Sequence, residues 1–249
     1  MRQAMKQLVR AAGLERPARG VITAWRRRSR RYARGWRDDE HLRLLLAFSL
    51  PAEANCVDVG AADGKVLTDI VRVAPFGRHI AYEPLPSFYT ALVSRFPQVD
   101  LRPAALSNVD GETTFTYVRD APWYSGFRQR DYPAGVKKLE TIVVRTERLD
   151  DHLPDGYVPH FIKIDVEGAE KLVLEGALDT ISRYKPIVVF EHGRGSSEYY
   201  GATPTDIFRI LHDEAGLRIF NLDAGGPYTL DQFQLAYDTN SHFNFVARR

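Results

Sequence analysis

The feature that most constrains this chain's fold is a regular alternation of short apolar segments with helix-like segments. Segments 55–60, 78–84 and 160–165 are rich in β-branched and aromatic residues, which is typical of buried strands. Segments 64–74 and 86–96 instead repeat apolar residues at the spacing of one helical face. Strands that alternate with helices form a parallel sheet with helices on both faces. The sequence therefore predicts an α/β fold.

Other segments extend this pattern. A helix is predicted over 38–50, with Asp38 or Asp39 as its N-cap and Pro51 as its stop. Residues 99–106 are predicted to form a strand, and 167–182 a helix with its apolar residues on one face. Further predicted elements are strands at 112–118, 140–149, 186–192, 217–223 and 242–249 and a helix at 203–215.

Basic charge is concentrated at the start of the chain. Residues 1–37 contain 12 Lys and Arg residues and one acidic residue, Glu15, for a net charge of +11. The remaining 22 basic and 31 acidic residues give a net charge of −9. This asymmetry predicts a basic arm at 1–37, helical or partly disordered, followed by one domain at 38–249.

Composition excludes several classes of protein. The only cysteine, Cys56, permits neither an intramolecular disulfide nor a cluster of thiolate metal ligands. No segment reaches the roughly 20 apolar residues that a membrane-spanning helix needs. We therefore expect a cytoplasmic protein.

The segment after the first predicted strand indicates the cofactor. Gly60 and Gly64 allow a tight turn close to a ligand, but Ala62 stands where a dinucleotide-binding motif needs glycine. No Gly-Lys-Ser/Thr follows, so the loop is not a phosphate-binding P-loop. Glu83 ends the second strand, where a ribose diol needs an acceptor. This combination fits S-adenosylmethionine (SAM), although Glu83 could also be a solvated acid at a strand end.

Four motifs resemble the FkbM family of SAM-dependent methyltransferases. They are CVDVGAADG, AYEPLPSF, AALSNVDGETTF and FIKIDVEGAEKLVLEGA followed by PIVVFEH, and together they cover about residues 54–248. KIDVEGAE is the most specific of them. The resemblance implies a class I, Rossmann-like methyltransferase fold with a mostly parallel seven-stranded sheet and helices on both faces. It also implies methylation of hydroxyl groups, mostly on sugars and natural products.

The resemblance also assigns residues to the cofactor. It places Asp58, Gly60 and Gly64 at the methionine end of SAM, Glu83 at the ribose, and segment 105–108 beside adenine. Asp63 departs from the family, because many members have asparagine there. The full predicted set is Asp58, Gly60, Ala61, Asp63, Gly64, Glu83, Pro84, Leu106, Ser107 and Asp165.

Three residues at strand ends are candidates for the chemistry. A hydroxyl acceptor must lose its proton, so we expect the base to be one of Asp165, Glu191 and His192, with His192 the natural base near neutral pH. Asp165 could instead be only a helix N-cap, His192 only a hydrogen-bonded loop residue, and Glu167 a helix cap. Asp165 and Glu191 could also suit Mg²⁺. With no third ligand evident, we predict no metal site.

Two segments are predicted to choose the acceptor, 119–138 with its aromatic residues and cations and the glycine-rich 193–204. A helical stripe in the arm, formed by Ile22, Trp25, Ser29, Tyr32 and Trp36, is flanked by arginines and could lie on an anionic membrane. The arm could instead be partly disordered or be a helix packed on its own domain. The leading hypothesis is a cytoplasmic SAM-dependent O-methyltransferase acting on a sugar, glycan or natural product, which the arm could hold at the inner membrane face. The alternatives are an RNA methyltransferase, which the basic arm suggests and the acidic domain disfavours, and a non-catalytic interaction protein.

Overall fold

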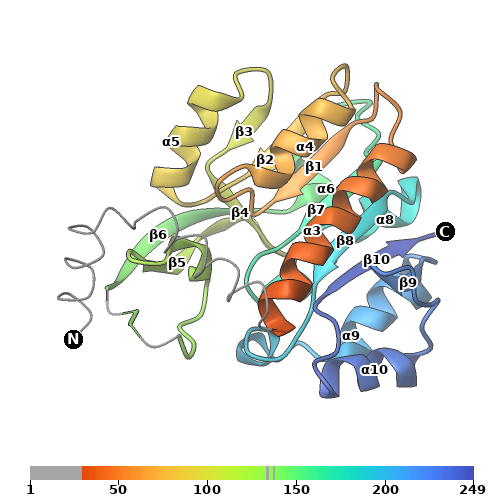
Figure 1. Cartoon of the computed structure of the whole chain (residues 1–249). Coiled ribbons are helices and arrows are strands. Elements are labelled where there is room, and N and C mark those ends of the chain that lie inside the picture. Colours follow the sequence, from red (N-terminus) through yellow and green to blue (C-terminus); the bar gives the residue numbers. More distant parts are fainter. Residues whose placement is uncertain (1–29, 133–134, 137) are drawn as a thin grey trace, which may run out of the picture. The chain divides into compact units, whose positions relative to one another are not determined.

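A computed structural model describes residues 30–132, 135–136 and 138–249 (Figure 1). The chain divides into two units, Met1–Leu45 and Leu46–Arg249. In the first unit the described residues are helical and belong to α3 (Arg30–Ser49), which continues to the unit boundary and beyond it. Asp38 and Asp39 lie inside this helix, so the prediction that one of them is the N-cap is wrong. The predicted stop before Pro51 is confirmed.

The second unit is built on a seven-stranded sheet in the order β3-β2-β1-β7-β8-β10-β9. Strands from β3 to β8 pair in parallel, whereas β10 is antiparallel to both of its neighbours. This topology confirms the predicted class I methyltransferase fold. The strands are β1 (Cys56–Val59), β2 (His79–Tyr82), β3 (Asp100–Arg102), β7 (Phe161–Ile164), β8 (Ile187–Glu191), β9 (Arg218–Asn221) and β10 (Asn244–Arg248).

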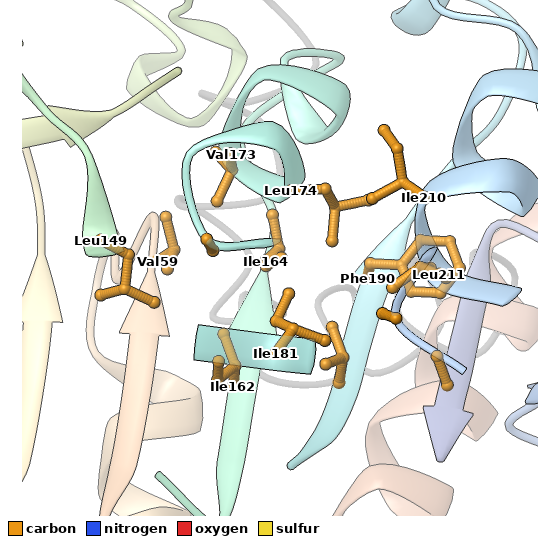
Figure 2. Packing of buried hydrophobic residues seen from close by; sticks show 14 of the residues in the cluster. Val59, Leu149, Ile162, Ile164, Val173, Leu174, Ile181, Phe190, Ile210 and Leu211 are labelled. Carbon is orange, nitrogen blue, oxygen red and sulfur yellow. The ribbon is translucent and has the colours of Figure 1, made fainter. Parts of the chain in front are cut away.

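Helices pack on both faces of this sheet. On one face, Leu67 of α4 and Leu92 of α5 form a buried cluster with Ala81 of β2. On the other, Val59, Ile164 and Phe190 pack against α7, α8 and the segment after α9, as Figure 2 shows. The helices are α4 (Lys65–Val73), α5 (Pro86–Arg95), α6 (Leu149–His152), α7 (Glu170–Glu175), α8 (Leu178–Tyr184), α9 (Pro204–Phe208), a π-helical turn (Arg209–Glu214) and α10 (Leu230–Asp238).

A second sheet of three strands, in the order β4-β6-β5, lies in the chain between β3 and β7. The predicted strand 99–106 is in fact two strands, β3 and β4 (Ala104–Leu106), because Pro103 cannot continue the ladder of hydrogen bonds. The other two strands, β5 (Gly111–Val118) and β6 (Leu139–Glu147), form an antiparallel hairpin. Their connection contains the aromatic and cationic segment 119–138.

Two predicted helices also differ from the structure. The single helix expected over 167–182 is divided into α7 and α8 at Gly176, where a Cβ atom would lie 2.0 Å from the Ser107 carbonyl oxygen. The helix expected over 203–215 changes into the π-helical turn after Phe208. Helix α10 was not predicted at all. Among the described helices, none is both long and apolar enough to cross a membrane.

Candidate functional site

The strand order reverses between β1 and β7, and ligands of parallel α/β sheets bind at the carboxyl ends of the strands at such a switch point. The turn after β1 is built on Gly60, which has a φ of 76°. A Cβ atom at Gly60 would lie 2.1 Å from the carbonyl oxygen of Asp165. Only glycine therefore lets the turns after β1 and β7 approach this closely.

A cavity with about 550 Å³ of empty space, partly open to solvent, lies at this switch point. Phe88, Phe115, Phe127 and Trp123 give it an apolar wall suited to a flat nucleobase. The other lining residues are Val59, Gly60, Ala62, Tyr82, Glu83, Pro84, Leu85, Ala104, Ala105, Leu106, Pro122, Ser125, Asp165, Val166 and Glu167.

Five of the predicted cofactor residues line this cavity: Gly60, Glu83, Pro84, Leu106 and Asp165. The other five, Asp58, Ala61, Asp63, Gly64 and Ser107, do not. Ala61 is buried with Leu67 and Ala81, and a Cβ atom at Gly64 would meet Leu92 of α5 at 2.6 Å. Gly64 therefore leaves room for helix packing, and its expected place beside the cofactor stays a prediction.

Asp63 also has local partners. Its carboxylate accepts a hydrogen bond from the Lys65 backbone N–H, and its carbonyl oxygen accepts one from Arg95. The aromatic wall was missed by sequence reasoning because Phe115 and Phe127 belong to the second sheet and its connection. Their only sequence signal was the aromatic content of that insertion.

Glu83 is buried at the cavity wall. Its two carboxylate oxygens accept hydrogen bonds from the backbone N–H groups of Ala62 and Leu85, each at 2.8 Å. Burial raises its pKa to about 7, against the opposing effect of these hydrogen bonds. Each oxygen retains a second lone pair, so the carboxylate can still accept a hydrogen bond from each hydroxyl of a ribose diol.

Asp58 provides a second test of the fit to SAM. Its side chain is 1% exposed, and neither carboxylate oxygen has a hydrogen-bond partner among the described residues. The nearest cation is the Lys163 ammonium, 4.0 Å from Asp58 Oδ1. An unsatisfied buried carboxylate beneath the Gly60 turn is suited to the ammonium group of the cofactor's methionine end. These residues therefore fit SAM, which supplies an activated methyl group when bound.

Acidic side chains gather at the ends of β7 and β8. The Asp165 side chain is 40% exposed and accepts a hydrogen bond of 3.1 Å from Lys163. Burial raises its pKa, but the ion pair with Lys163 outweighs that effect and holds the pKa below its ordinary value. Burial together with the nearby carboxylates of Asp165 and Glu167 raises the pKa of Glu191 well above the ordinary value. The pKa values of the two neighbouring groups are therefore shifted in opposite directions, which favours ionisation of Asp165 and protonation of Glu191.

His192 is in a different environment from the one expected. Its ring is 1% exposed and stacks on Phe233 and Tyr237 of α10, with centroids 5.7 and 4.9 Å away. Neither ring nitrogen has a hydrogen-bond partner among the described residues, and burial lowers its pKa to about 4. His192 is also absent from the cavity lining. A buried ring that resists protonation cannot readily accept a proton from an acceptor, which argues against its predicted role as base.

Glu167 does not cap helix α7 as we had considered. It lies before the helix, with a φ of 58°, and forms an ion pair with Arg130 of the segment 119–138. Glu170 instead accepts the N–H groups of Val166 and Gly168, each at 3.1 Å. Glu170 therefore stabilises the turn between β7 and α7, and Glu167 links the segment 119–138 to that turn through Arg130.

The two segments predicted to choose the acceptor lie against each other. The hydroxyl groups of Tyr199 and Tyr200 accept hydrogen bonds from the backbone N–H groups of Asp131 and Arg128. A Cβ atom at Gly168 would lie 2.6 Å from the Ser196 backbone, so this glycine leaves room for the backbone of the segment 193–204. Among the described residues, no group of three or more His, Cys, Asp or Glu side chains is placed to hold a metal ion.

Comparisons with known proteins identify the family of this chain. The sequence matches the model of the methyltransferase FkbM domain over residues 58–219. No curated protein matches the chain significantly.

Similar solved structures include methyltransferase FkbM from Methylobacillus flagellatus KT, at 18% identity and a TM-score of 0.49, covering 79% of this chain and 44% of that one. This chain thus spans less than half of that relative. A TehB-like SAM-dependent methyltransferase from Corynebacterium glutamicum is 14% identical, with a TM-score of 0.45, and the match covers 87% of this chain and 94% of that one. The plantazolicin methyltransferase BpumL in complex with SAH is 7% identical, with a TM-score of 0.44, and the match covers 94% of this chain and 91% of that one. The match to the FkbM family model extends over more than half of this protein's own length. The chain therefore belongs to the FkbM family of SAM-dependent methyltransferases.

Proposed function

We propose that this protein transfers the methyl group of SAM to a hydroxyl oxygen of a sugar, glycan or natural-product acceptor. The observation that carries the proposal is the position of Asp165. Its partly exposed carboxylate lines the cofactor cavity and also belongs to the acidic pair with Glu191. A base at this position would reach an acceptor bound beside the cofactor.

The base in such a transfer does not need a high pKa. Bound SAM would supply an activated methyl group, and a hydroxyl oxygen that bonded to this methyl group as the carbon–sulfur bond broke would carry a strongly acidic proton. Asp165, held ionised by Lys163, can accept this proton although its pKa is low. The raised pKa of Glu191 lets this residue keep its proton, and a protonated Glu191 would donate a hydrogen bond to the Asp165 carboxylate and orient that carboxylate.

The surroundings of the cavity mouth support a sugar-like acceptor. Trp123 is 57% exposed, lines the cavity and sits in a short 3-10 turn (Pro122–Tyr124). Hydrogen bonds at both ends fix this turn, because Tyr124 N–H donates to Ala121 and the Ser125 hydroxyl accepts from Val118 N–H. A rigid, exposed aromatic face can pack on the apolar face of a sugar ring.

We also propose that residues 1–37 bring this site to the inner face of an anionic membrane. Most of the arm, including Ile22, Trp25 and Ser29, lies outside the described residues. The proposal is supported by its net charge of +11 and by the interleaving of tryptophan and tyrosine with arginine. A lipid-linked glycan would then be a natural acceptor.

The acceptor class can be tested with SAM carrying a radiolabelled methyl group. The protein is incubated with glycan, lipid and RNA fractions of cells, and each product is treated with mild alkali and with ribonuclease. We expect alkali-stable label, as in a methyl ether, in the glycan or glycolipid fraction. D165N should lower transfer by roughly 10²–10⁴-fold, whereas E112Q, a change of an exposed carboxylate on β5, should not. Ribonuclease-sensitive or alkali-labile label would contradict the proposal, and so would its complete absence.

A further inference from the structure

Lys163 occupies an unusual place for a lysine. It lies in β7, a central strand of the sheet, and only 11% of its side chain is exposed. Burying an ammonium group is costly unless the charge is paired. Two carboxylates on different segments provide that pairing. Asp165 Oδ2 lies 3.1 Å from the Lys163 Nζ atom, and Asp58 Oδ1 lies 4.0 Å from it.

The two partners belong to different halves of the site. Asp58 is the register partner of Lys163 on β1 and comes two residues before Gly60 in the chain. Asp165 ends β7 and lines the cavity beside Glu191. The ammonium group thus stands between the carboxylate suited to the cofactor's methionine end and the carboxylate proposed as the base.

We propose that Lys163 is a positioning residue that holds Asp58 and Asp165 as one ion-paired unit and so couples the cofactor half of the site to the acceptor half. The role of Asp165 as base rests on the proposed function, whereas the coupling to Asp58 does not. Without Lys163, the buried Asp58 carboxylate would be left with the repulsion of the partly exposed Asp165 and no nearby cation among the described residues. The acid at the cofactor end would then be harder to ionise.

Several charges act on Asp58. Burial raises its pKa to about 6, Lys163 opposes this effect, and Asp165 and Asp63 add to it. Glu191 also faces Lys163, and Glu83 is sensitive to both Asp58 and Lys163. Removing the lysine should therefore raise the pKa of Asp58, and removing the charge of Asp165 should lower it. These opposite shifts distinguish an electrostatic link from a merely structural lysine.

The test uses S-adenosylhomocysteine (SAH), which keeps the ammonium group of the cofactor and needs no acceptor. Its affinity for the full chain is measured by calorimetry between pH 5 and 8.5. The wild type should bind more weakly as the pH falls through the pKa of Asp58, and D58N should lack that part of the profile. K163M should move the midpoint up by about one pH unit or more, and D165N should move it down. K163R, which keeps the charge, should stay close to the wild type.

Lys171 provides a matched control, because it pairs with Asp206 at 3.2 Å on the surface of α7 and α9. K171M should leave the SAH profile unchanged. Midpoints of K163M and D165N that match the wild type would overturn the coupling while leaving the proposed function standing. If K163M does not fold, the direction of the D165N shift decides. Failure of the wild type to bind SAH at any pH would instead contradict the cofactor site itself.

Discussion

At the scale of single residues, the carboxylates of this site differ in the direction of their pKa shifts. The Lys163 ammonium holds the pKa of Asp165 below its ordinary value, whereas burial and the neighbouring acids raise the pKa of Glu191. Such separation of pKa values is common where one group accepts a proton and a neighbour orients it. The sequence shows these acids at strand ends but cannot show which of them the lysine pairs with.

Glu83 provides the most direct residue-scale prediction. E83A should weaken SAH binding roughly 10- to 100-fold, because charge-assisted hydrogen bonds to the ribose would be lost. E83Q keeps only one acceptor oxygen, because its NH2 group would face the backbone N–H of either Ala62 or Leu85. We therefore expect it to lose affinity as well, although less than E83A. Calorimetry measures both, with E112A as the control. Equal affinity for wild type and a folded E83A would mean that Glu83 does not hold the ribose.

His192 should remain neutral across the physiological range. Because burial lowers its pKa to about 4, an NMR titration of its ring should show no protonation between pH 5.5 and 8. H192F, which preserves aromatic stacking on Phe233 and Tyr237, should bind SAH as the wild type does. A ring that titrates near pH 6.5 would restore the histidine as a candidate base.

The buried environment of His192 could not be predicted from the sequence. Its position at the end of a strand was predicted correctly, but both stacking partners come from α10, which was not predicted. Without that helix, the histidine had no visible reason to be buried. Gly64 is similar, because its contact with α5 depends on tertiary packing rather than on the loop motif.

At the scale of elements, the turn between β7 and α7 joins the parts of the site. Glu170 caps its N–H groups, and Glu167 extends from it to Arg130. The strand and helix on either side were predictable from their apolar periodicity. The division of the helix at Gly176 was not, because it depends on close approach to the Ser107 backbone.

Glu170 makes this turn sensitive to pH. Burial raises its pKa to about 7, from 4.5 for the free side chain, despite its hydrogen bonds from backbone N–H groups. The folded protein therefore holds this proton more tightly than the unfolded chain. Its contribution to stability is complete below about pH 4.5 and is lost as the pH rises through 7.

E170Q removes the titrating carboxyl group and keeps one oxygen that can accept the N–H groups of Val166 and Gly168. Urea unfolding at pH 5 and pH 8 should show that the free energy of unfolding falls less for E170Q than for wild type, by up to about 3 kcal/mol. E112Q, a change of an exposed carboxylate, should follow the wild type. Parallel pH dependence of wild type and E170Q would show that Glu170 is already ionised in the fold.

At the scale of the whole molecule, the arm at 1–37 and the methyltransferase unit carry opposite charge. The class I fold could be predicted because strands, helices and motifs all indicated the same topology. The order of the sheet, with β10 between β8 and β9, could not be obtained from periodicity, since it depends on pairing between distant segments. The second sheet was visible only as extra strands around an insertion.

Vesicle co-sedimentation tests the arm. The full chain should pellet with vesicles containing anionic lipid at low salt and be released at high salt, because each cation contributes about 1 kcal/mol that salt screens. A chain that starts at Asp38 should stay in the supernatant, and neither should pellet with neutral vesicles. If both chains behave alike, the membrane role is removed and the site acts on a dissolved acceptor.

A crystal structure of the protein with bound SAH tests the central claim most directly, because it shows which residues hold the cofactor. We predict the ribose hydroxyls on the Glu83 carboxylate, the adenine against the wall formed by Phe115 and Phe127, and the amino-acid end at the Gly60 turn above Asp58. Asp165 should face the sulfur from the acceptor side. SAH bound elsewhere, or with its ribose away from Glu83, would contradict this account of the site.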